Sequence, residues 1–243
     1  MKDGFFTTVS NKKIARDVFK MELAGDTSEI KRPGQFVNFA IEGLYLRRPV
    51  SVCDVADGRL TVIYKVVGKG TSKMAEAAPG DGFKVLTGLG NGYNLEKAGA
   101  KPLLIGGGVG VPPLYLLAKE LVKRGAKPAA VLGFNSAEDV FYEEEFRSAG
   151  CETVVTTVDG SYGIKGFVTD ALPEEYTYFY TCGPLPMLKA VFSAAKTEGQ
   201  FSLEERMGCG FGACMGCSMM TADGPKRICK DGPVFEKREL LWS

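Results

Sequence analysis

The chain has 243 residues, of which 45% are hydrophobic and 24% are charged, and its net charge is +1. This is the composition of a globular protein large enough for more than one domain, and the balanced charge gives no reason to expect nucleic acid or an anionic membrane as a partner. The absence of histidine excludes His-dependent catalytic triads and a Rieske-type cluster with histidine ligands.

Two further features favour a cytoplasmic protein. No apolar run is as long as a membrane span, and residues 1–10 contain no long apolar stretch of the kind found in signal peptides. We therefore expect a metal site, rather than structural disulfides, to account for the cysteine usage of the chain.

Residues 1–98 predict a small antiparallel β-barrel. Short runs rich in β-branched and aromatic residues are separated by turn residues, which is typical of such barrels. The runs are 4–9, 18–23, 35–40 and 60–67. A short helix is expected over 71–78, ended by Pro79-Gly80.

The motif Arg47-Arg48-Pro49-Val50-Ser51 is the first candidate cofactor contact in this half. An arginine can pair with a phosphate, the proline presets the backbone, and the serine hydroxyl can bond a ring nitrogen or a backbone group. Taken alone, the motif is also typical of an exposed basic turn.

The second candidate is Gly68-Lys69-Gly70-Thr71-Ser72, which precedes the short helix. Glycines at a helix start leave backbone N–H groups free to bind an anion. The alternative is an ordinary N-cap formed by Thr71 or Ser72.

Residues 99–203 alternate between β and α patterns and predict an open parallel sheet. The first strand, 102–105, runs into a glycine turn and then an apolar helix over 114–124. Further strands are expected at 129–134, 153–157 and 176–181, and further helices at 142–148, 168–172 and 185–196.

Two glycine turns, 106–110 and Cys182-Gly183-Pro184, follow strands of this sheet. Open parallel sheets bind ligands at the carboxyl ends of their strands, so both turns are candidate nucleotide contacts. The first turn reads Gly108-x-Gly110-x-x-Pro113 rather than the full dinucleotide fingerprint. No lysine or arginine lies between Ser136 and Arg147, which favours NAD over NADP, because a 2′-phosphate usually requires a base.

The cysteines of the first two regions are not expected to react. Cys182 can pack beside a bound nicotinamide, and no histidine is present to activate it as a nucleophile. Cys53 and Cys151 are expected to be inert.

Residues 204–243 contain the most specific motif of the chain. Cys209, Cys214 and Cys217 form a C-x4-C-x2-C run, and eleven further residues separate Cys217 from Cys229. This is the ligand spacing of a plant-type [2Fe–2S] cluster. Structural zinc sites usually consist of two C-x2-C pairs, so the spacing favours the cluster over zinc. Trp242 is expected to cover apolar surface.

A barrel followed by a nucleotide-binding α/β domain resembles the ferredoxin–NADP reductase superfamily. The resemblance implies an FAD-binding domain over 1–98, an NAD-binding domain over 99–203 and a cluster lobe over 204–243. It implies that Arg48, Pro49, Val50 and Ser51 hold FAD, with Arg48 at the pyrophosphate and Ser51 near flavin N5. It also implies that the isoalloxazine is lined by Ile63, Tyr64 and Lys65, that the pyrophosphate is held by Gly70, Thr71 and Ser72, and that the nicotinamide nucleotide is held by Gly106, Gly107, Gly108, Gly110, Cys182, Gly183 and Pro184.

With its cluster lobe, the whole chain is similar to the electron-transfer subunits of heterotetrameric, NAD-linked bacterial dihydroorotate dehydrogenases. This similarity implies a separate FMN subunit that oxidises dihydroorotate to orotate in pyrimidine biosynthesis, with two copies of each subunit. Electrons would run from FMN through the [2Fe–2S] cluster and FAD to NAD+.

Other functions stay open, because subunits of sulfhydrogenases and of ferredoxin:NADP oxidoreductases share these motifs. A reductase that needs no partner is a further alternative. The alternative that is not an enzyme is a zinc-stapled nucleotide-binding regulator.

Overall fold

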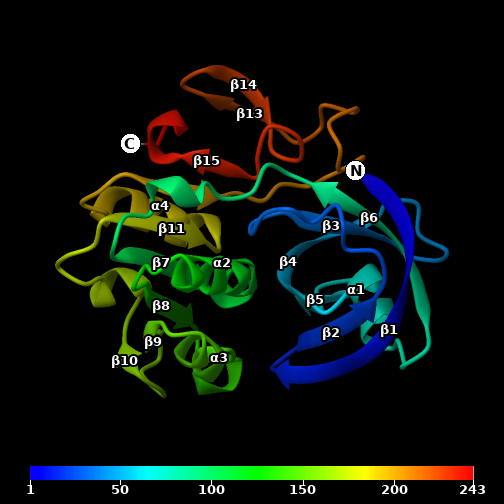
Figure 1. Cartoon of the computed structure of the whole chain (residues 1–243), viewed down its shortest axis with the longest axis horizontal. Helices are drawn as coiled ribbons and strands as arrows, with labels where there is room; N and C mark the ends of the chain where they lie inside the picture. Colours follow the sequence, from blue (N-terminus) through cyan, green and yellow to red (C-terminus); the bar gives the residue numbers. More distant parts are fainter. Residues whose placement is uncertain (243) are drawn as a thin grey trace.

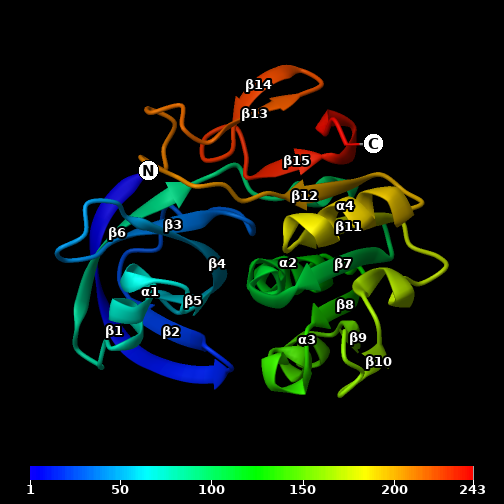
Figure 2. The same cartoon turned by 180° about the vertical axis from the view of Figure 1, so that it is seen from behind.

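The structure is a computed structural model that describes residues 1–242. A β-barrel and an α/β unit lie side by side, and the C-terminal segment lies across one end of both (Figure 1). The view from behind shows the same arrangement (Figure 2). None of the described helices is long and apolar enough to cross a bilayer.

The barrel is closed by six antiparallel strands in the order β1-β2-β5-β4-β3-β6, which confirms the predicted barrel. Its interior is filled by fully buried apolar side chains such as Phe6, Phe39 and Val62. The strands are β1 (Lys2–Ala15), β2 (Val18–Ala24), β3 (Phe36–Ala40), β4 (Arg48–Ala56), β5 (Arg59–Lys65) and β6 (Gly82–Leu89), and α1 (Lys69–Ala75) follows β5.

Two of these strands, β4 and β6, are not predicted by the sequence patterns. β4 begins with the Arg48-Pro49 motif, which by itself is typical of a turn, and β6 begins and nearly ends with glycine. Tertiary pairing overrides both local signals, because β4 is held between β3 and β5 and β6 is held between β1 and β3.

The α/β unit is built on a seven-stranded sheet in the order β10-β9-β8-β7-β11-β12-β15. The strands from β10 to β12 run parallel, as predicted. They are β7 (Pro102–Gly107), β8 (Ala129–Phe134), β9 (Glu152–Thr157), β10 (Ile164–Lys165), β11 (Tyr178–Cys182) and β12 (Gly199–Ser202).

Helices cover both faces of this sheet. The apolar sides of α2 (Pro112–Lys123) and α3 (Glu143–Ser148) share one core with it, and α4 (Leu185–Ala194) packs into the core on the other face. Short 3-10 turns complete the unit: η1 (Leu95–Lys97), η2 (Gly108–Gly110), η3 (Ala137–Asp139) and η4 (Val168–Ala171).

The predicted helices differ in detail from the observed ones. The helices expected over 71–78, 114–124 and 185–196 are α1, α2 and α4, whose bounds differ from the expected ones by one to three residues at one or both ends. The segment 168–172 forms the single 3-10 turn η4 rather than an α-helix. The helix predicted over 142–148 begins one residue later, because Tyr142 has a left-handed backbone with φ 67° and stands outside it.

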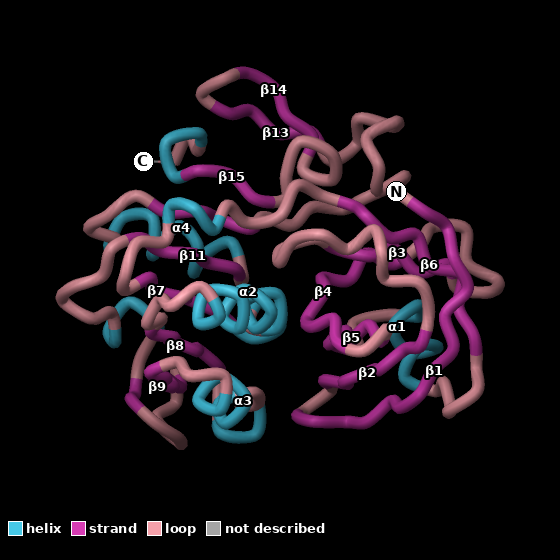
Figure 3. The backbone as a smooth tube through the Cα atoms, in the orientation of Figure 1, coloured by secondary structure: helices cyan, strands magenta, loops and turns pink. Residues whose placement is uncertain are grey.

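The C-terminal segment folds back onto the sheet. It contains the hairpin of β13 (Ser218–Thr221) and β14 (Gly224–Arg227), then β15 (Val234–Glu236) and η5 (Lys237–Glu239). β15 pairs antiparallel with β12, so the sheet is not purely parallel and the cluster lobe is joined to it through hydrogen bonds. Figure 3 shows that loops connect the short strands of this lobe. Trp242 packs edge-on against Phe192 and Phe201, as expected for a residue that covers apolar surface.

The two units meet at α2, which packs against β4. Lys119 on α2 places its Nζ 2.8 Å from both carboxylate oxygens of Asp54 on β4. This ion pair and the apolar contacts around it hold the barrel and the nucleotide-binding unit in one relative orientation.

Candidate cofactor-binding sites

The four cysteines of the C-terminal lobe lie in two pairs. The Sγ atoms of Cys217 and Cys229 are 3.2 Å apart and buried, and the backbone N–H of Cys214 donates to Cys209 Sγ at 3.4 Å. Within residues 1–242, no three His, Cys, Asp or Glu side chains gather around one metal-ion position. A [2Fe–2S] core takes four thiolates, and each of its two irons is bound by two of them. The paired arrangement therefore fits such a core.

Backbone N–H groups point at the sulfur atoms of these pairs. The N–H groups of Ala213 and Cys214 donate to Cys209 Sγ at 3.2 and 3.4 Å, and that of Cys229 donates to Cys217 Sγ at 3.4 Å. Burial raises the pKa of Cys209, but the hydrogen bonds from the backbone outweigh it and lower this pKa to about 6. The loop is therefore arranged to stabilise negative sulfur.

The second pair behaves differently. Burial and the adjacent Cys217 sulfur raise the pKa of Cys229 to about 12. A thiolate at this position therefore requires a bound cation, which is what metal ligation supplies.

The loop over residues 209–217, the cluster loop, lies against the barrel at β3. The Asn38 side chain is 1% exposed, and its Nδ2 is 3.5 Å from the Cys209 carbonyl oxygen. Gly210 has φ +78°, and a Cβ at this position would lie 2.4 Å from Asn38 Nδ2, so only glycine permits the close approach. In the register of the barrel, Asn38 is paired with Pro49 on β4. The cluster cysteines thus lie one strand away from the Arg48–Ser51 motif.

The structure brings Arg48 and the start of α1 together. A Cβ built on Gly70 would lie 2.2 Å from Arg48 Nε, so the arginine lies directly over this glycine. Thr71 Oγ1 accepts hydrogen bonds from the backbone N–H groups of Val67 and Gly68 at 2.9 and 3.2 Å, which is a capping interaction at the helix start. The N-cap is therefore Gly68 rather than Thr71 or Ser72, and Thr71 caps from the third helical position. The Arg48 contact with Gly70 is unaffected.

The other barrel residues expected to contact FAD differ in how far their side chains are buried. Val50 is buried in the barrel, whereas Pro49 is exposed and Ser51 and Ser72 are half-buried. The Tyr64 side chain is buried, and its hydroxyl donates to Asn11 Oδ1 at 3.0 Å, so its ring is unavailable to a cofactor. Ile63 packs in the core shared with α2, and Lys65 is half-buried.

The two predicted nucleotide turns are neighbours. β7 and β11 are adjacent parallel strands, and Cys182 is paired with Gly106. A Cβ on Gly110 would lie 2.3 Å from the Cys182 carbonyl oxygen, and one on Gly107 would lie 2.4 Å from Met187 Sδ. The turns therefore approach as closely as glycine allows. Gly108 and Gly183 are half-buried, and Pro184 is exposed beside them.

The other cysteines have no reactive environment. Burial raises the pKa of Cys182, of Cys53 and of Cys151, each to about 12. A neutral thiol is a poor nucleophile, which agrees with the inert role expected of all three.

Sequence reasoning missed one basic residue near the loop after β8. Arg16 of the barrel places its Nη2 3.0 Å from Ser136 Oγ and 2.7 Å from Asp139 Oδ2, and it also pairs with Glu138. More than a hundred residues separate Arg16 from this loop, so no local pattern reveals the contact. The guanidinium is occupied by two carboxylates, so the loop stays unsuited to a 2′-phosphate.

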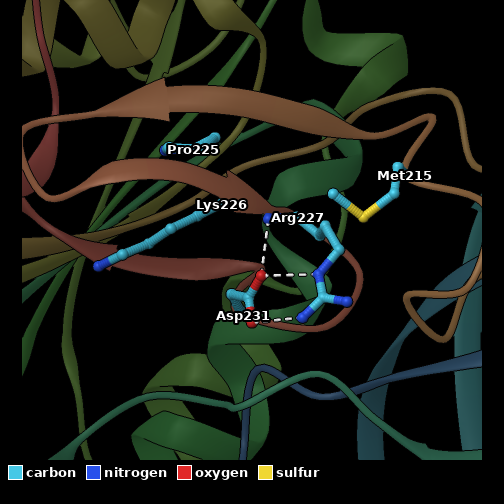
Figure 4. Close-up of a pocket in the computed structure, with 5 residues that line it drawn as sticks. All are labelled: Met215, Pro225, Lys226, Arg227 and Asp231. Atoms are coloured by element: carbon cyan, nitrogen blue, oxygen red, sulfur yellow. Dashed lines mark hydrogen bonds and ion pairs between the residues drawn. The ribbon is translucent and has the colours of Figure 1, made fainter.

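A cavity of about 470 Å³ lies beside the cluster loop and is lined by Met215, Pro225, Lys226, Arg227 and Asp231 (Figure 4). A second cavity of about 570 Å³ lies between the barrel, η1 and α2. None of the predicted flavin or nicotinamide contacts lines either cavity, so we assign those contacts from the loop geometry instead.

Comparisons with known proteins agree with this geometry. Residues 204–241 match the model of the iron-sulfur cluster binding domain of dihydroorotate dehydrogenase B, and residues 104–193 match that of the oxidoreductase NAD-binding domain. The chain is 45% identical to the dihydroorotate dehydrogenase B (NAD(+)) electron transfer subunit of Fusobacterium nucleatum, with 97% of each chain covered. It is 46% identical to the protein of the same name from Bacillus caldolyticus, again with 97% of each covered.

Among solved structures, the chain is similar to one described as an NADH-dependent reduced ferredoxin-NADP oxidoreductase that performs flavin-based electron bifurcation. The TM-score is 0.89 at 33% identity, and the match covers 98% of this chain and 90% of the other.

Proposed function

Because this chain belongs to the family of dihydroorotate dehydrogenase B (NAD(+)) electron transfer subunits, we propose that it delivers to NAD+ the electrons that a catalytic partner subunit removes from dihydroorotate. The chain is an oxidoreductase subunit of pyrimidine biosynthesis, and its cofactors are FAD, a [2Fe–2S] cluster and NAD. When bound, FAD can exchange a hydride with nicotinamide and single electrons with the cluster, so it connects the two.

The observation that carries the proposal is the position of the cluster loop on β3, one strand from the flavin motif on β4. The chain's own residues hold and orient the groups. In our assignment Cys209, Cys214, Cys217 and Cys229 bind the cluster. The assigned FAD contacts are Arg48, Pro49, Ser51, Lys65, Gly70, Thr71 and Ser72, with Val50, Ile63 and Tyr64 contributing main chain, and the assigned NAD contacts are Gly106, Gly107, Gly108, Gly110, Cys182, Gly183 and Pro184.

No acid or base of the protein is required for hydride exchange, and the chain contains no histidine to supply one. The protein's contribution would be to hold FAD through its barrel residues and NAD through its glycine turns, and to exclude water between them.

The exposed side of the cluster loop supports a partner at this end of the molecule. Cys214 is exposed, and Phe211 and Met215 beside it are 42% and 55% exposed. We propose that the partner is an FMN subunit that docks over this loop, that two copies of each subunit form a heterotetramer, and that the complex is cytoplasmic.

The first test is capture of the tagged chain from its native extract, followed by an assay of dihydroorotate-dependent NAD+ reduction. We expect activity together with a co-captured FMN protein. Capture of a brown, flavin-loaded chain that is inert to dihydroorotate would instead favour a ferredoxin- or hydrogenase-linked complex. A colourless chain that contains zinc would support the nucleotide-binding regulator.

The second test is Cys214→Ser in the captured complex. We expect dihydroorotate-dependent NAD+ reduction to be lost, while NADH oxidation by a dye that accepts electrons from the flavin is retained. Cys151→Ser, which changes a buried cysteine outside the cluster lobe, is the matched control and should retain both activities. Loss of both activities in Cys214→Ser with FAD still bound would show that the assumed order of electron carriers is wrong.

A further inference from the structure

Arg227 connects the two segments that carry the cluster cysteines. It is the last residue of β14 and lies two positions before Cys229. Its Nη1 donates to the carbonyl oxygen of Gly212 at 3.0 Å, and Gly212 lies between Cys209 and Cys214 in the other segment. One guanidinium therefore spans the loop with the first three ligands and the loop with the fourth.

Asp231 fixes the orientation of this guanidinium. Arg227 Nε and Nη2 donate to Asp231 Oδ2 and Oδ1 at 3.0 and 3.1 Å, which is a two-point contact (Figure 4). The Arg227 backbone N–H also donates to Asp231 Oδ2 at 2.8 Å. Both side chains are only about one-third exposed, at 30% and 34%. A two-point carboxylate contact restricts the arginine far more than a single ion pair does.

The carbonyl that Arg227 contacts belongs to the peptide between Gly212 and Ala213. Gly212 has φ +94°, a conformation that only glycine adopts readily. The N–H of the same peptide unit, on Ala213, donates to Cys209 Sγ at 3.2 Å. Arg227 thus holds the carbonyl oxygen of this peptide while its N–H points at the first cysteine.

We propose that Arg227, held by Asp231, is a positioning residue of the cluster: it clamps the peptide between Gly212 and Ala213 so that the Ala213 N–H stays on the Cys209 sulfur, and it ties the two ligand-bearing loops together. The inference rests on the proposed function in that it assumes a [2Fe–2S] cluster on these four cysteines. Arg227 binds no cluster atom and acts through Gly212.

The direction of the effect follows from electrostatics. Reduction adds a negative charge to the cluster, and hydrogen bonds to its sulfur atoms stabilise that charge and raise the reduction potential. Release of the Gly212 peptide should therefore lower the potential. A hydrogen bond to a charged group changes an equilibrium constant by about tenfold or more, and for a one-electron couple tenfold corresponds to about 59 mV.

The test compares three variants of the full-length, cluster-loaded chain. Arg227→Lys keeps the positive charge but cannot contact Asp231 at two points and Gly212 at once. Asp231→Asn keeps the arginine and removes the group that orients it. Lys226→Gln removes a positive charge at the adjacent position, where the side chain pairs with Asp223 and Glu239 and points away from the cluster loop (Figure 4).

The readouts are the midpoint potential from an EPR-monitored redox titration, the visible circular dichroism of the oxidised cluster and the rate of iron release to a chelator. For Arg227→Lys we expect a potential lower by about 59 mV, a changed dichroism spectrum and iron release faster by about tenfold. Asp231→Asn should shift all three readouts in the same direction, and Lys226→Gln should match the unmodified chain.

The inference would be overturned if Arg227→Lys left the midpoint potential and the dichroism of the cluster unchanged. It would also be overturned if Lys226→Gln shifted the potential as much as Arg227→Lys does, because net charge alone would then explain the shift. These outcomes differ from failure of the proposed function, in which the unmodified chain itself would contain no iron, no sulfide and no EPR signal after reduction.

Discussion

The contact between the two nucleotide turns makes Gly110 a sensitive position. The backbone conformation of Gly110 is one that alanine can adopt, since its φ is not positive. The neighbouring atoms, which leave no room for a Cβ, are what exclude alanine. A Cβ there would lie 2.3 Å from the Cys182 carbonyl oxygen and 2.6 Å from Gly183 Cα, both of which are main-chain atoms that cannot rotate away. Gly110→Ala therefore forces the turns after β7 and β11 apart.

The displacement can be estimated from the structure. Ordinary van der Waals contact of a Cβ begins near 3.4 Å, so the turns must separate by about 1 Å. Overpacking of this kind costs about 1–3 kcal/mol. If the turns hold the nicotinamide nucleotide, as we propose, that cost weakens NADH binding by about 5- to 150-fold.

The assay is the dissociation constant of NAD+ by titration calorimetry, together with the KM of NADH in a flavin-dependent dye reduction. Gly107→Ala is the matched comparison, because its Cβ would meet the flexible Met187 Sδ at 2.4 Å and that side chain can move. We expect Gly107→Ala to weaken NADH binding less than Gly110→Ala does. The absorbance of FAD and of the cluster should be unchanged in both, since neither residue lies in the Arg48–Ser51 motif or has a cluster cysteine among the neighbours of its Cβ position.

One result would refute this reasoning. If Gly110→Ala folds with unchanged stability and binds NADH with the affinity of the unmodified chain, the contact between the turns is not part of the nucleotide site.

Three other predictions concern stability and flavin retention. Trp242→Ala should lower the free energy of unfolding in urea by about 2 kcal/mol, since the ring is half-buried on aromatic neighbours. Burial raises the pKa of Glu236, but hydrogen bonds from Gln200 and Lys97 outweigh it and hold this pKa below 4.5. Its folded pKa is lower than its unfolded one, so Glu236→Gln should cost about 1 kcal/mol at pH 7, and the difference between the two proteins should vanish as urea titrations move below pH 4.5. Arg48→Ala should lose FAD on dialysis while the cluster spectrum is retained; equal retention of FAD would show that Arg48 does not hold it.

Local sequence patterns were sufficient for much of the fold. The alternation of strands and helices over 99–203 predicted the parallel sheet, because strands such as β7 are buried apolar runs followed by an amphipathic helix such as α2. The barrel was predicted from its turn residues, although β4 and β6 carried no clear strand signal. Those strands form because their neighbours pair with them, and pairing between distant segments leaves no local mark in the sequence.

The cysteine spacing and the two glycine turns were visible in the sequence alone, because each is a contiguous motif whose chemistry depends on residues a few positions apart. Three contacts instead join segments that are 12 to 171 residues apart. They are the contact of Cys217 with Cys229, that of Arg227 with Gly212, and that of Asn38 with the Cys209 carbonyl of the cluster loop. The same holds for Arg16 beside Asp139 and for β15 on β12.

The sequence by itself therefore determined which chemical groups this protein offers: four clustered cysteines, two glycine turns and the basic Arg48–Ser51 motif. Only the tertiary structure decided how they are arranged, with the cluster loop one strand from that motif and the two glycine turns in contact. The physical reason is that ligand type is a property of single residues and short spacings, whereas distance between sites depends on strand register and packing across the whole chain.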